Sequence, residues 1–252
     1  MIKITGIIRN ASVLTFWVAV WQIVALIIGR ELLIPSPLRV VLRLADFSVS
    51  EKFWAMTAVS LFRVMSGFLW GVASGILTAA LTFRFRALHN LISPLLTVIR
   101  VTPIASFIIL ALVWMSSGVV PVFISFLIVL PIVWSGVSAG LESVDHSLAE
   151  TALMYNITGY KLMTKLYIPS VMPFFRTSVI NAIGFAWKTG VAAEVLCVPA
   201  FSIGKQIYEA KLYLETVDLF AWTAALVIIS LIIEQLLKFA IRMTESKIEY
   251  YT

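Results

Sequence analysis

Charge is scarce in this sequence: only 13% of its 252 residues are Asp, Glu, Lys or Arg, whereas 61% are hydrophobic. A soluble domain has about 25% charged residues, and half of that amount cannot cover the surface of a soluble globule of this size. The mean hydropathy of +1.00 agrees. The composition therefore excludes a cytosolic enzyme, a secreted domain and a disordered tail, and it indicates an integral membrane protein.

Cysteine and histidine are also scarce. The single Cys197 excludes an internal disulfide, and His89 and His146 lie far apart without acidic or thiol neighbours at ligand spacing, so we expect no metal site. The sequence contains no Gly-x4-Gly-Lys-Ser/Thr phosphate loop. We therefore expect no catalytic residue, metal or cofactor in this chain. In so apolar a protein, the net charge of +6 favours cytoplasmic loops and lipid headgroups over nucleic acid.

Long apolar runs, in contrast, are abundant, and a helix needs about 20 apolar residues to cross a membrane. The run at residues 101–141 has no charge and twice this length, and a turn signal at residues 116–121 divides it. The first run has no cleavage site after it, so we predict an anchor rather than a signal peptide. The sequence predicts an all-α membrane protein, a single transmembrane domain over residues 1–252. Its six predicted spans are Val13–Ile28, Val64–Phe83, Leu95–Met115, Val119–Ala139, Thr177–Cys197 and Thr216–Leu237.

The distribution of Lys and Arg predicts the orientation. Six spans place both termini on one side of the membrane. If that side is cytoplasmic, the inner segments hold 11 Lys and Arg residues, including Arg100, and the outer segments hold 6. Because cytoplasmic loops carry the excess of these residues, the count favours cytoplasmic N- and C-termini.

Residues 141–173, between the fourth and fifth predicted spans, form the longest polar insertion on the inner side. Residues 142–155 are predicted to be a helix, since apolar residues recur there at spacings of three and four. Asn156 is predicted to end this helix in the left-handed conformation. The apolar stripe consists of Leu141, Val144, Leu148, Ala152 and Tyr155.

A second short helix is predicted after Asn156. Thr158 is a candidate N-cap, and Pro169 and Pro173 are predicted to end the helix before the fifth span. Its apolar face consists of Tyr160, Leu162, Met163 and Leu166. The loop is therefore predicted to place two short helices across the inner surface.

The order of residues in this loop resembles a known signature. Glu150, Thr151 and Ala152 precede Asn156 by six to four positions, and Pro169 follows Asn156 by thirteen. This spacing is that of the cytoplasmic loop of ATP-binding-cassette (ABC) importer permeases: Glu-Ala-Ala, three residues, Gly, nine residues, Ile-x-Leu-Pro. Departures at Thr151, Asn156, Leu166 and Ile168 keep size, apolarity or turn-forming ability.

The resemblance extends over most of the chain and points to the nitrate, sulfonate and taurine branch of these type I permeases. The matching segments occur in order along the sequence. They are Ile34–Pro37, Ser60–Arg63 with Gly67 and Phe68, Ser93–Leu95, Gly184–Trp187, and Ala193 with Glu194.

The resemblance implies a permease subunit, not an enzyme, in the bacterial cytoplasmic (inner) membrane. Two cytoplasmic ATP-binding subunits would bind ATP and Mg²⁺ and drive alternating access. An external, periplasmic substrate-binding protein would deliver a small solute, which we expect to be an anion. A second permease copy, in a homodimer, would complete the pathway within the membrane lipid. The residues implied in ATPase coupling are Glu150, Thr151, Ala152, Tyr155, Asn156, Leu166 and Pro169.

Two charges lie inside the fifth predicted span, where a lone charge costs roughly 2.5–3.5 kcal/mol. Lys188 and Glu194 are six residues apart, so they cannot pair on one helix face. Lys188, beside Trp187, either offers a cation to an anionic substrate or forms an interhelical ion pair or snorkels. Glu194 is expected to act as a gate or to stabilise helix contacts. We take Trp187, Lys188 and Glu194 as candidate substrate-pathway residues.

Other motifs have structural interpretations. Arg63 is expected to contact headgroups or a loop, and Glu234 and Lys238 are expected to pair at the inner end of the last helix. Small residues at every fourth position predict a ridge for close helix packing. They are Gly67, Gly71 and Gly75.

Two other classes of protein remain as alternatives. A membrane-embedded enzyme would need clustered His, Asp or Glu, or a Ser/Lys pair, and the sequence has only scattered charges. An ion-gradient-driven secondary transporter would show an internal repeat or broken helices with acidic residues at mid-depth, and no clear repeat is present. The identity of the solute does not follow from this chain, because specificity in the family resides largely in the binding protein.

Overall fold

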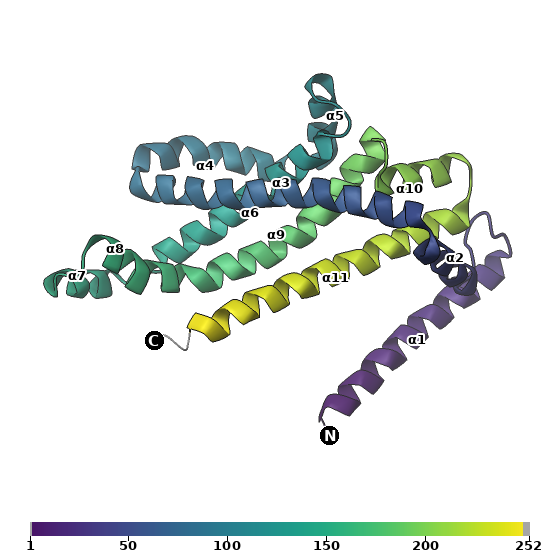
Figure 1. The fold of residues 1–252 in the computed structure, drawn as a ribbon, viewed down its shortest axis with the longest axis horizontal. Helices are drawn as coiled ribbons and strands as arrows, with labels where there is room; N and C mark the ends of the chain where they lie inside the picture. Colours follow the sequence, from purple (N-terminus) through teal and green to yellow (C-terminus); the bar gives the residue numbers. More distant parts are fainter. Residues whose placement is uncertain (1, 249–252) are drawn as a thin grey trace.

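The protein is all-α in the computed structural model, which describes residues 2–248 (Figure 1). Over this range the chain forms helices and no strands, which confirms the predicted fold class. The helices are α1 (Ile2–Ile28), α2 (Pro37–Val49), α3 (Glu51–Arg84), α4 (Arg86–Val101), α5 (Ile104–Trp114), α6 (Val120–Glu142), α7 (His146–Met154), α8 (Gly159–Leu162), a π-helical turn (Met163–Tyr167), α9 (Ile168–Cys197), α10 (Ile203–Leu212) and α11 (Thr216–Ile248).

The number of spans differs from the predicted six. Among the described residues, four helices are long and apolar enough to cross a membrane: α3, α6, Gly159–Cys197 and α11. The bent pair α4 and α5 makes a fifth if it is one span, and the apolar part of α1 described here, Ser12–Ile28, is shorter. The chain is a multi-pass membrane protein, and within residues 2–248 four helices have by themselves the length and apolarity to cross.

The third predicted span, Leu95–Met115, is wrong as a single helix. Helix α4 begins at Arg86, and the chain bends by 105° between α4 and α5. Pro103 lacks an N–H group and disfavours helical geometry in the preceding residue, so Thr102 is extended, with φ −75° and ψ 133°. Arg100, which the sequence count assigned to an inner segment, therefore lies in the last turn of α4, next to the bend.

Helix α6 is the centre of the bundle and packs against both α3 and α9 (Figure 1). The glycine ridge of α3 faces α6. A Cβ atom on Gly67 would lie 2.2 Å from the carbonyl oxygen of Val122, and one on Gly71 would lie 2.6 Å from Cβ of Val129. Gly75 is similarly close to α6. The predicted small-residue ridge is confirmed, because these contacts leave no room for a side chain.

We expect Gly67→Ala to destabilise the bundle, because the added methyl group would overlap the backbone of α6. Overpacking of this kind costs about 1–3 kcal/mol. The matched control is Gly184→Ala in α9, where an added Cβ meets no atom within 4 Å. Thermal unfolding in detergent should show a lower midpoint for Gly67→Ala and an unchanged or higher one for Gly184→Ala, since Ala favours helix over Gly. Equal midpoints would contradict the close α3–α6 packing.

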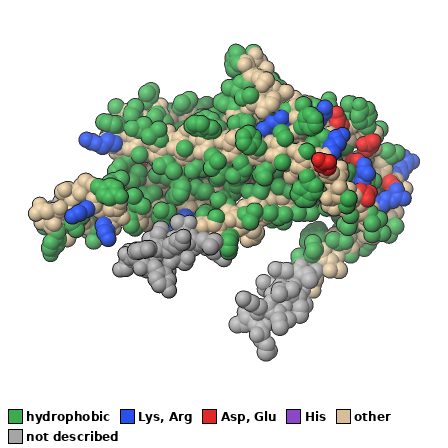
Figure 2. Space-filling model, viewed as in Figure 1, with side chains coloured by type: hydrophobic (Ala, Val, Ile, Leu, Met, Phe, Trp, Pro, Cys, Tyr) green, Lys and Arg blue, Asp and Glu red, His purple; other side chains and the backbone are tan. Residues whose placement is uncertain are grey.

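The polar residues gather at the ends of the bundle. Figure 2 shows acidic and basic side chains together around α2 and α10, whereas a broad apolar band covers the helices between the two ends. At the α2 end, Arg43 makes two hydrogen bonds of 2.7 Å to Asp218 at the start of α11. The side-chain hydrogen bond with Asp218 raises the pKa of Arg43. These contacts hold α2 against α11.

Candidate functional site

The insertion between α6 and α9 forms the two short helices that the sequence predicts. Helices α7 and α8 lie together at one end of the molecule (Figure 1). Asn156 has a φ of 57° and separates them, so its predicted left-handed conformation is confirmed. The N–H group of Ile157 donates to the carbonyl oxygen of Ala152 at 2.9 Å. Asn is the non-glycine residue that best tolerates this conformation, which explains how it replaces the glycine of the family signature.

The first helix differs from the predicted range, residues 142–155. The chain leaves the helical path after Glu142, and Asp145 accepts hydrogen bonds from the amide and hydroxyl of Ser147 at 2.8 and 2.6 Å. Asp145 thereby begins a separate helix, α7. The apolar stripe is divided as a result: Leu141 and Val144 are buried in the bundle, whereas Leu148 and Tyr155 are exposed.

The second helix also differs from the prediction, because Pro169 and Pro173 do not end it. Helix α8 continues through the π-helical turn into α9, so Gly159–Cys197 is one helix of 39 residues. Pro169 lies in the first turn of α9, and neighbouring helices allow a proline such as Pro173 within a membrane helix. Thr158 occupies the N-cap position but its side chain makes no capping hydrogen bond. The second short helix, α8, is thus continuous with a spanning helix.

Several exposed apolar side chains lie near Glu150 on these short helices. We define the coupling surface as Leu148, Glu150, Met154, Tyr155 and Tyr160, all of which are exposed. Met154 and Tyr160 each expose 83% of their surface. Exposed apolar patches of this kind mark sites of protein interaction.

The other predicted coupling residues lie beside this surface. Thr151, Asn156 and Pro169 are exposed, and Ala152 and Leu166 are half-buried. The Thr151 hydroxyl donates to the carbonyl oxygen of Ser147 at 2.7 Å.

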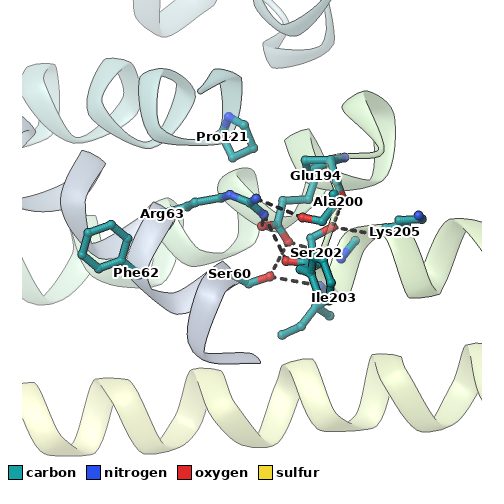
Figure 3. A network of polar contacts seen from close by, with 12 residues as sticks. Ser60, Phe62, Arg63, Pro121, Glu194, Ala200, Ser202, Ile203 and Lys205 are labelled. Atoms are coloured by element: carbon teal, nitrogen blue, oxygen red, sulfur yellow. Dashed lines mark hydrogen bonds and ion pairs between the residues drawn. The ribbon is translucent and has the colours of Figure 1, made fainter. Parts of the chain in front are cut away.

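A buried polar network occupies the opposite end of the bundle, between α3, α9 and α10 (Figure 3). Glu194 of α9 has no exposed surface. One of its oxygens accepts from the Ser60 hydroxyl at 2.7 Å and from the Gly204 amide at 3.3 Å. Its other oxygen lies 3.3 Å from a guanidinium nitrogen of Arg63. The cost of burying this carboxylate is offset by these three donors.

Arg63 extends the network to the turn between α9 and α10. Its guanidinium donates to the carbonyl oxygens of Ala200 at 3.0 Å and Phe201 at 3.3 Å, and the Ile203 amide donates to the Ser60 hydroxyl. Arg63 contacts a loop, as the sequence suggests, and it also pairs with Glu194, which the sequence does not reveal. We call Ser60, Arg63 and Glu194 with these backbone groups the outer clamp, after the orientation that the sequence predicts.

The three candidate pathway residues are not brought together. Trp187 is 1% exposed and donates its indole N–H to the carbonyl oxygen of Leu226 in α11 at 3.1 Å. Lys188, one residue later, is exposed on a different face of α9. Within the described residues Lys188 has no hydrogen-bond or ion-pair partner. The structure therefore places Trp187 in the core, Glu194 in the buried polar network and Lys188 on the exposed surface.

The chain is similar to several proteins that are named as transport permeases. It is 28% identical to a probable ABC transporter permease protein of Brucella melitensis, over 95% of this chain and 97% of that protein. It is 26% identical to a nitrate import permease protein of Synechococcus elongatus, over 78% of this chain and 74% of that protein. A putative aliphatic sulfonates transport permease protein of Bacillus subtilis is 23% identical over 92% of this chain and 83% of its own length.

The family comparison covers most of the chain. Residues 71–250 match the family described as binding-protein-dependent transport system inner membrane component. The match includes α4 to α9 and thus both short helices, α7 and α8, and the charges of α9. The chain belongs to this family of ABC transporter permeases.

Proposed function

We propose that this protein is the membrane subunit of an ATP-driven importer for a small anion. Two cytoplasmic ATP-binding subunits would each dock on the coupling surface of one permease copy and would bind the ATP and Mg²⁺. The observation that carries the proposal is the continuous helix Gly159–Cys197. A push on α8 is transmitted along this helix to Lys188 and Glu194, because a packed helix moves as a rigid element.

The expected arrangement in the inner membrane follows from the proposal. The end with α7 and α8 would face the cytoplasm, and the C-terminal part of α11 lies toward the same end (Figure 1). The outer clamp would then face the external binding protein that delivers the solute. A second copy, in a homodimer, would supply the other half of the pathway.

The proposal that the solute is an anion rests on two observations. Relatives are named for nitrate and for aliphatic sulfonates, both of which are anions. Lys188 is exposed on a spanning helix, and no carboxylate among the described residues pairs with it. A charge inside a membrane is costly and therefore rare, and it commonly marks a functional site. We propose that Lys188 attracts the anion as it crosses.

The alternative of a gradient-driven transporter has one point in its favour, since the α4–α5 pair is a broken helix. However, the cavity at this break is lined by Arg100 and by no Asp or Glu among the described residues. Proteoliposomes with the full complex and radiolabelled nitrate or taurine, with the matching binding protein, distinguish the two mechanisms. We expect uptake to require hydrolysable ATP and to continue in the presence of ionophores. Uptake that does not require ATP and that ionophores abolish would refute the proposal.

The role of Lys188 makes a separate prediction. Lys188→Met should lower the rate of anion uptake about tenfold, the equivalent of 1.4 kcal/mol of lost stabilisation during passage. Lys188→Arg, which keeps the charge, should retain most of the rate. Recovery of the complex with its ATPase subunits should be unaffected in both variants, since Lys188 is far along α9 from the coupling surface. Full uptake by Lys188→Met would leave Lys188 without a transport role.

A further inference from the structure

A cavity of about 400 Å³ lies at the break between α4 and α5. Its walls come from both sides of the break, from the middle of α6 and from α9, and they are largely apolar. Two polar side chains, Arg100 and Thr102, interrupt this lining. The lining residues are Ile99–Ile104, Ile128, Pro131, Ile132 and Phe185. An apolar cavity with a few polar groups is the usual form of a small-molecule site.

Arg100 is an exposed residue far along α4. It is 14 residues from the start of α4 at Arg86, a distance of about 21 Å along the helix axis. Helix α4 ends beside the middle of α3 (Figure 1), and α3 is a spanning helix. A cation at this depth is costly and therefore rare, and it faces a protein interior or a water-filled cavity.

The contacts of Arg100 hold it at the cavity instead of letting it snorkel toward headgroups. One guanidinium nitrogen donates to the carbonyl oxygen of Pro131 at 2.6 Å, and the guanidinium carbon lies 5.9 Å from the ring centre of Trp134. The indole N–H of Trp134 is itself fixed by Thr82 at 3.0 Å. Both contacts direct Arg100 toward α6, and no carboxylate among the described residues pairs with it.

Helix α9 forms the fourth wall of the cavity through Phe185. Phe185 lies three residues before Lys188 and therefore on the same side of α9. Both residues are exposed in this chain, as is Asn181, one turn earlier. The cavity that Arg100 lines thus also borders α9, the helix that carries Lys188 and that is continuous with α8.

We propose that this cavity is the anion-binding subsite of the transport pathway and that Arg100 is its principal ligand. The inference rests on the proposed function and adds a site and a ligand class, a small oxyanion such as nitrate or a sulfonate. Arginine has five N–H donors, and only one is engaged by Pro131. The remaining N–H donors of the guanidinium form a planar fork that matches the oxygens of an oxyanion. Helix α5 begins at the cavity, so its positive end adds to the attraction.

Thiol reactivity tests the subsite without requiring transport. Val101→Cys, in a Cys197→Ser background, places an exposed thiol on the cavity wall. Two methanethiosulfonate reagents of similar size and opposite charge serve as probes, one with a sulfonate and one with a trimethylammonium group. The full-length protein is used in nanodiscs, where both membrane sides are accessible. Ser116→Cys, an exposed position in the turn after α5, gives the intrinsic ratio of the two rates.

We expect the sulfonate reagent to be favoured at Val101→Cys by about tenfold relative to Ser116→Cys, since a nearby unit charge in a low-dielectric cavity has an effect of this order. Arg100→Met should remove the preference, and Arg100→Lys should keep most of it. An equal ratio at the two cysteines, or a preference that survives Arg100→Met, would overturn the subsite. If Arg100→Met does not fold, the comparison of the two cysteines with Arg100 intact still decides.

Transport then separates this inference from the proposed function. In proteoliposomes of the complete transporter, Arg100→Met should reduce ATP-dependent nitrate or taurine uptake at least tenfold, while the complex with the ATPase subunits stays intact. ATP-independent uptake by the unaltered protein would refute the importer but leave the thiol ratio as evidence for the subsite. Normal ATP-dependent uptake by Arg100→Met would refute the subsite and leave the importer standing.

Discussion

Glu150→Arg is expected to abolish the association of the permease with the proposed ATP-binding subunits. Glu150 is the only acidic member of the coupling surface, and the apolar side chains around it are exposed. Replacing its charge with the opposite one places a cation at the centre of a docked interface, where an unpaired charge of the wrong sign costs several kcal/mol. Co-purification of the ATPase subunits through a tag on the permease measures the effect, and we expect recovery to fall at least a hundredfold.

The matched control for this experiment is Glu209→Arg. Glu209 is a partly exposed acid on α10, at the opposite end of the bundle. The same charge reversal there should leave the complex intact, because α10 does not contact the ATPase in our account. Glu150→Arg should also reach the membrane in normal amounts, since the exposed side chain contributes nothing to the packing of the bundle. Normal ATPase recovery with Glu150→Arg would remove Glu150 from the docking site.

Glu194→Ala is expected to cause the largest loss of stability. The change leaves the largely buried guanidinium of Arg63 with only backbone carbonyl partners. It also removes the carboxylate that accepts hydrogen bonds from the Gly204 amide and the Ser60 hydroxyl. Removing one partner of a buried ion pair lowers the free energy of unfolding by about 3–5 kcal/mol. The midpoint of thermal unfolding in detergent should fall sharply, or the protein should fail to accumulate in membranes.

Two comparisons make this prediction specific to the outer clamp. Glu209→Ala breaks the more exposed pair of Glu209 with Lys205, and exposed pairs contribute about 0–1 kcal/mol, so its midpoint should barely change. The double variant Arg63→Ala with Glu194→Ala should lose less than the sum of the two single losses, because the residues share one interaction. A midpoint for Glu194→Ala equal to that of Glu209→Ala would show that the clamp does not stabilise the fold.

Features that depend on neighbouring residues were predictable from the sequence. Asn156 is followed by a second helix-forming stretch, so its turn conformation has a local cause, and it is confirmed. Glu234 and Lys238 are four residues apart on one helix, and their predicted ion pair is present. The glycine ridge of α3 is periodic in the sequence and lies against α6 as expected.

Features that depend on distant residues were not predictable. Arg63 and Glu194 are separated by 131 positions, and no pattern in either segment indicates that they meet. The number of apolar residues predicts the length of the third span but not the bend at Pro103, because the bend depends on backbone geometry and not on hydropathy. The π-helical turn that joins α8 to α9 has no comparable sequence signal, so the sequence wrongly predicts that Pro169 and Pro173 end the second short helix.

Two short helices were missed for a simpler reason. Helices α2 and α10 are too short and too polar to appear in a search for spans. Their starts do carry signals: Pro37 occupies the first turn of α2, and the Ser202 side chain accepts from the Lys205 amide at 3.0 Å at the start of α10. Both are common features of helix N-termini. Attention to such caps would have placed both helices.

The central claim is that the coupling surface lies in the cytoplasm, where a separate ATPase can bind it. The most direct measurement is thiol labelling of Met154→Cys in a Cys197→Ser background, because Met154 is 83% exposed at the tip of α7. With a membrane-impermeant maleimide, the account predicts no labelling in intact cells and full labelling in inside-out vesicles made without the ATPase subunits. Labelling of Met154→Cys in intact, sealed cells would contradict it.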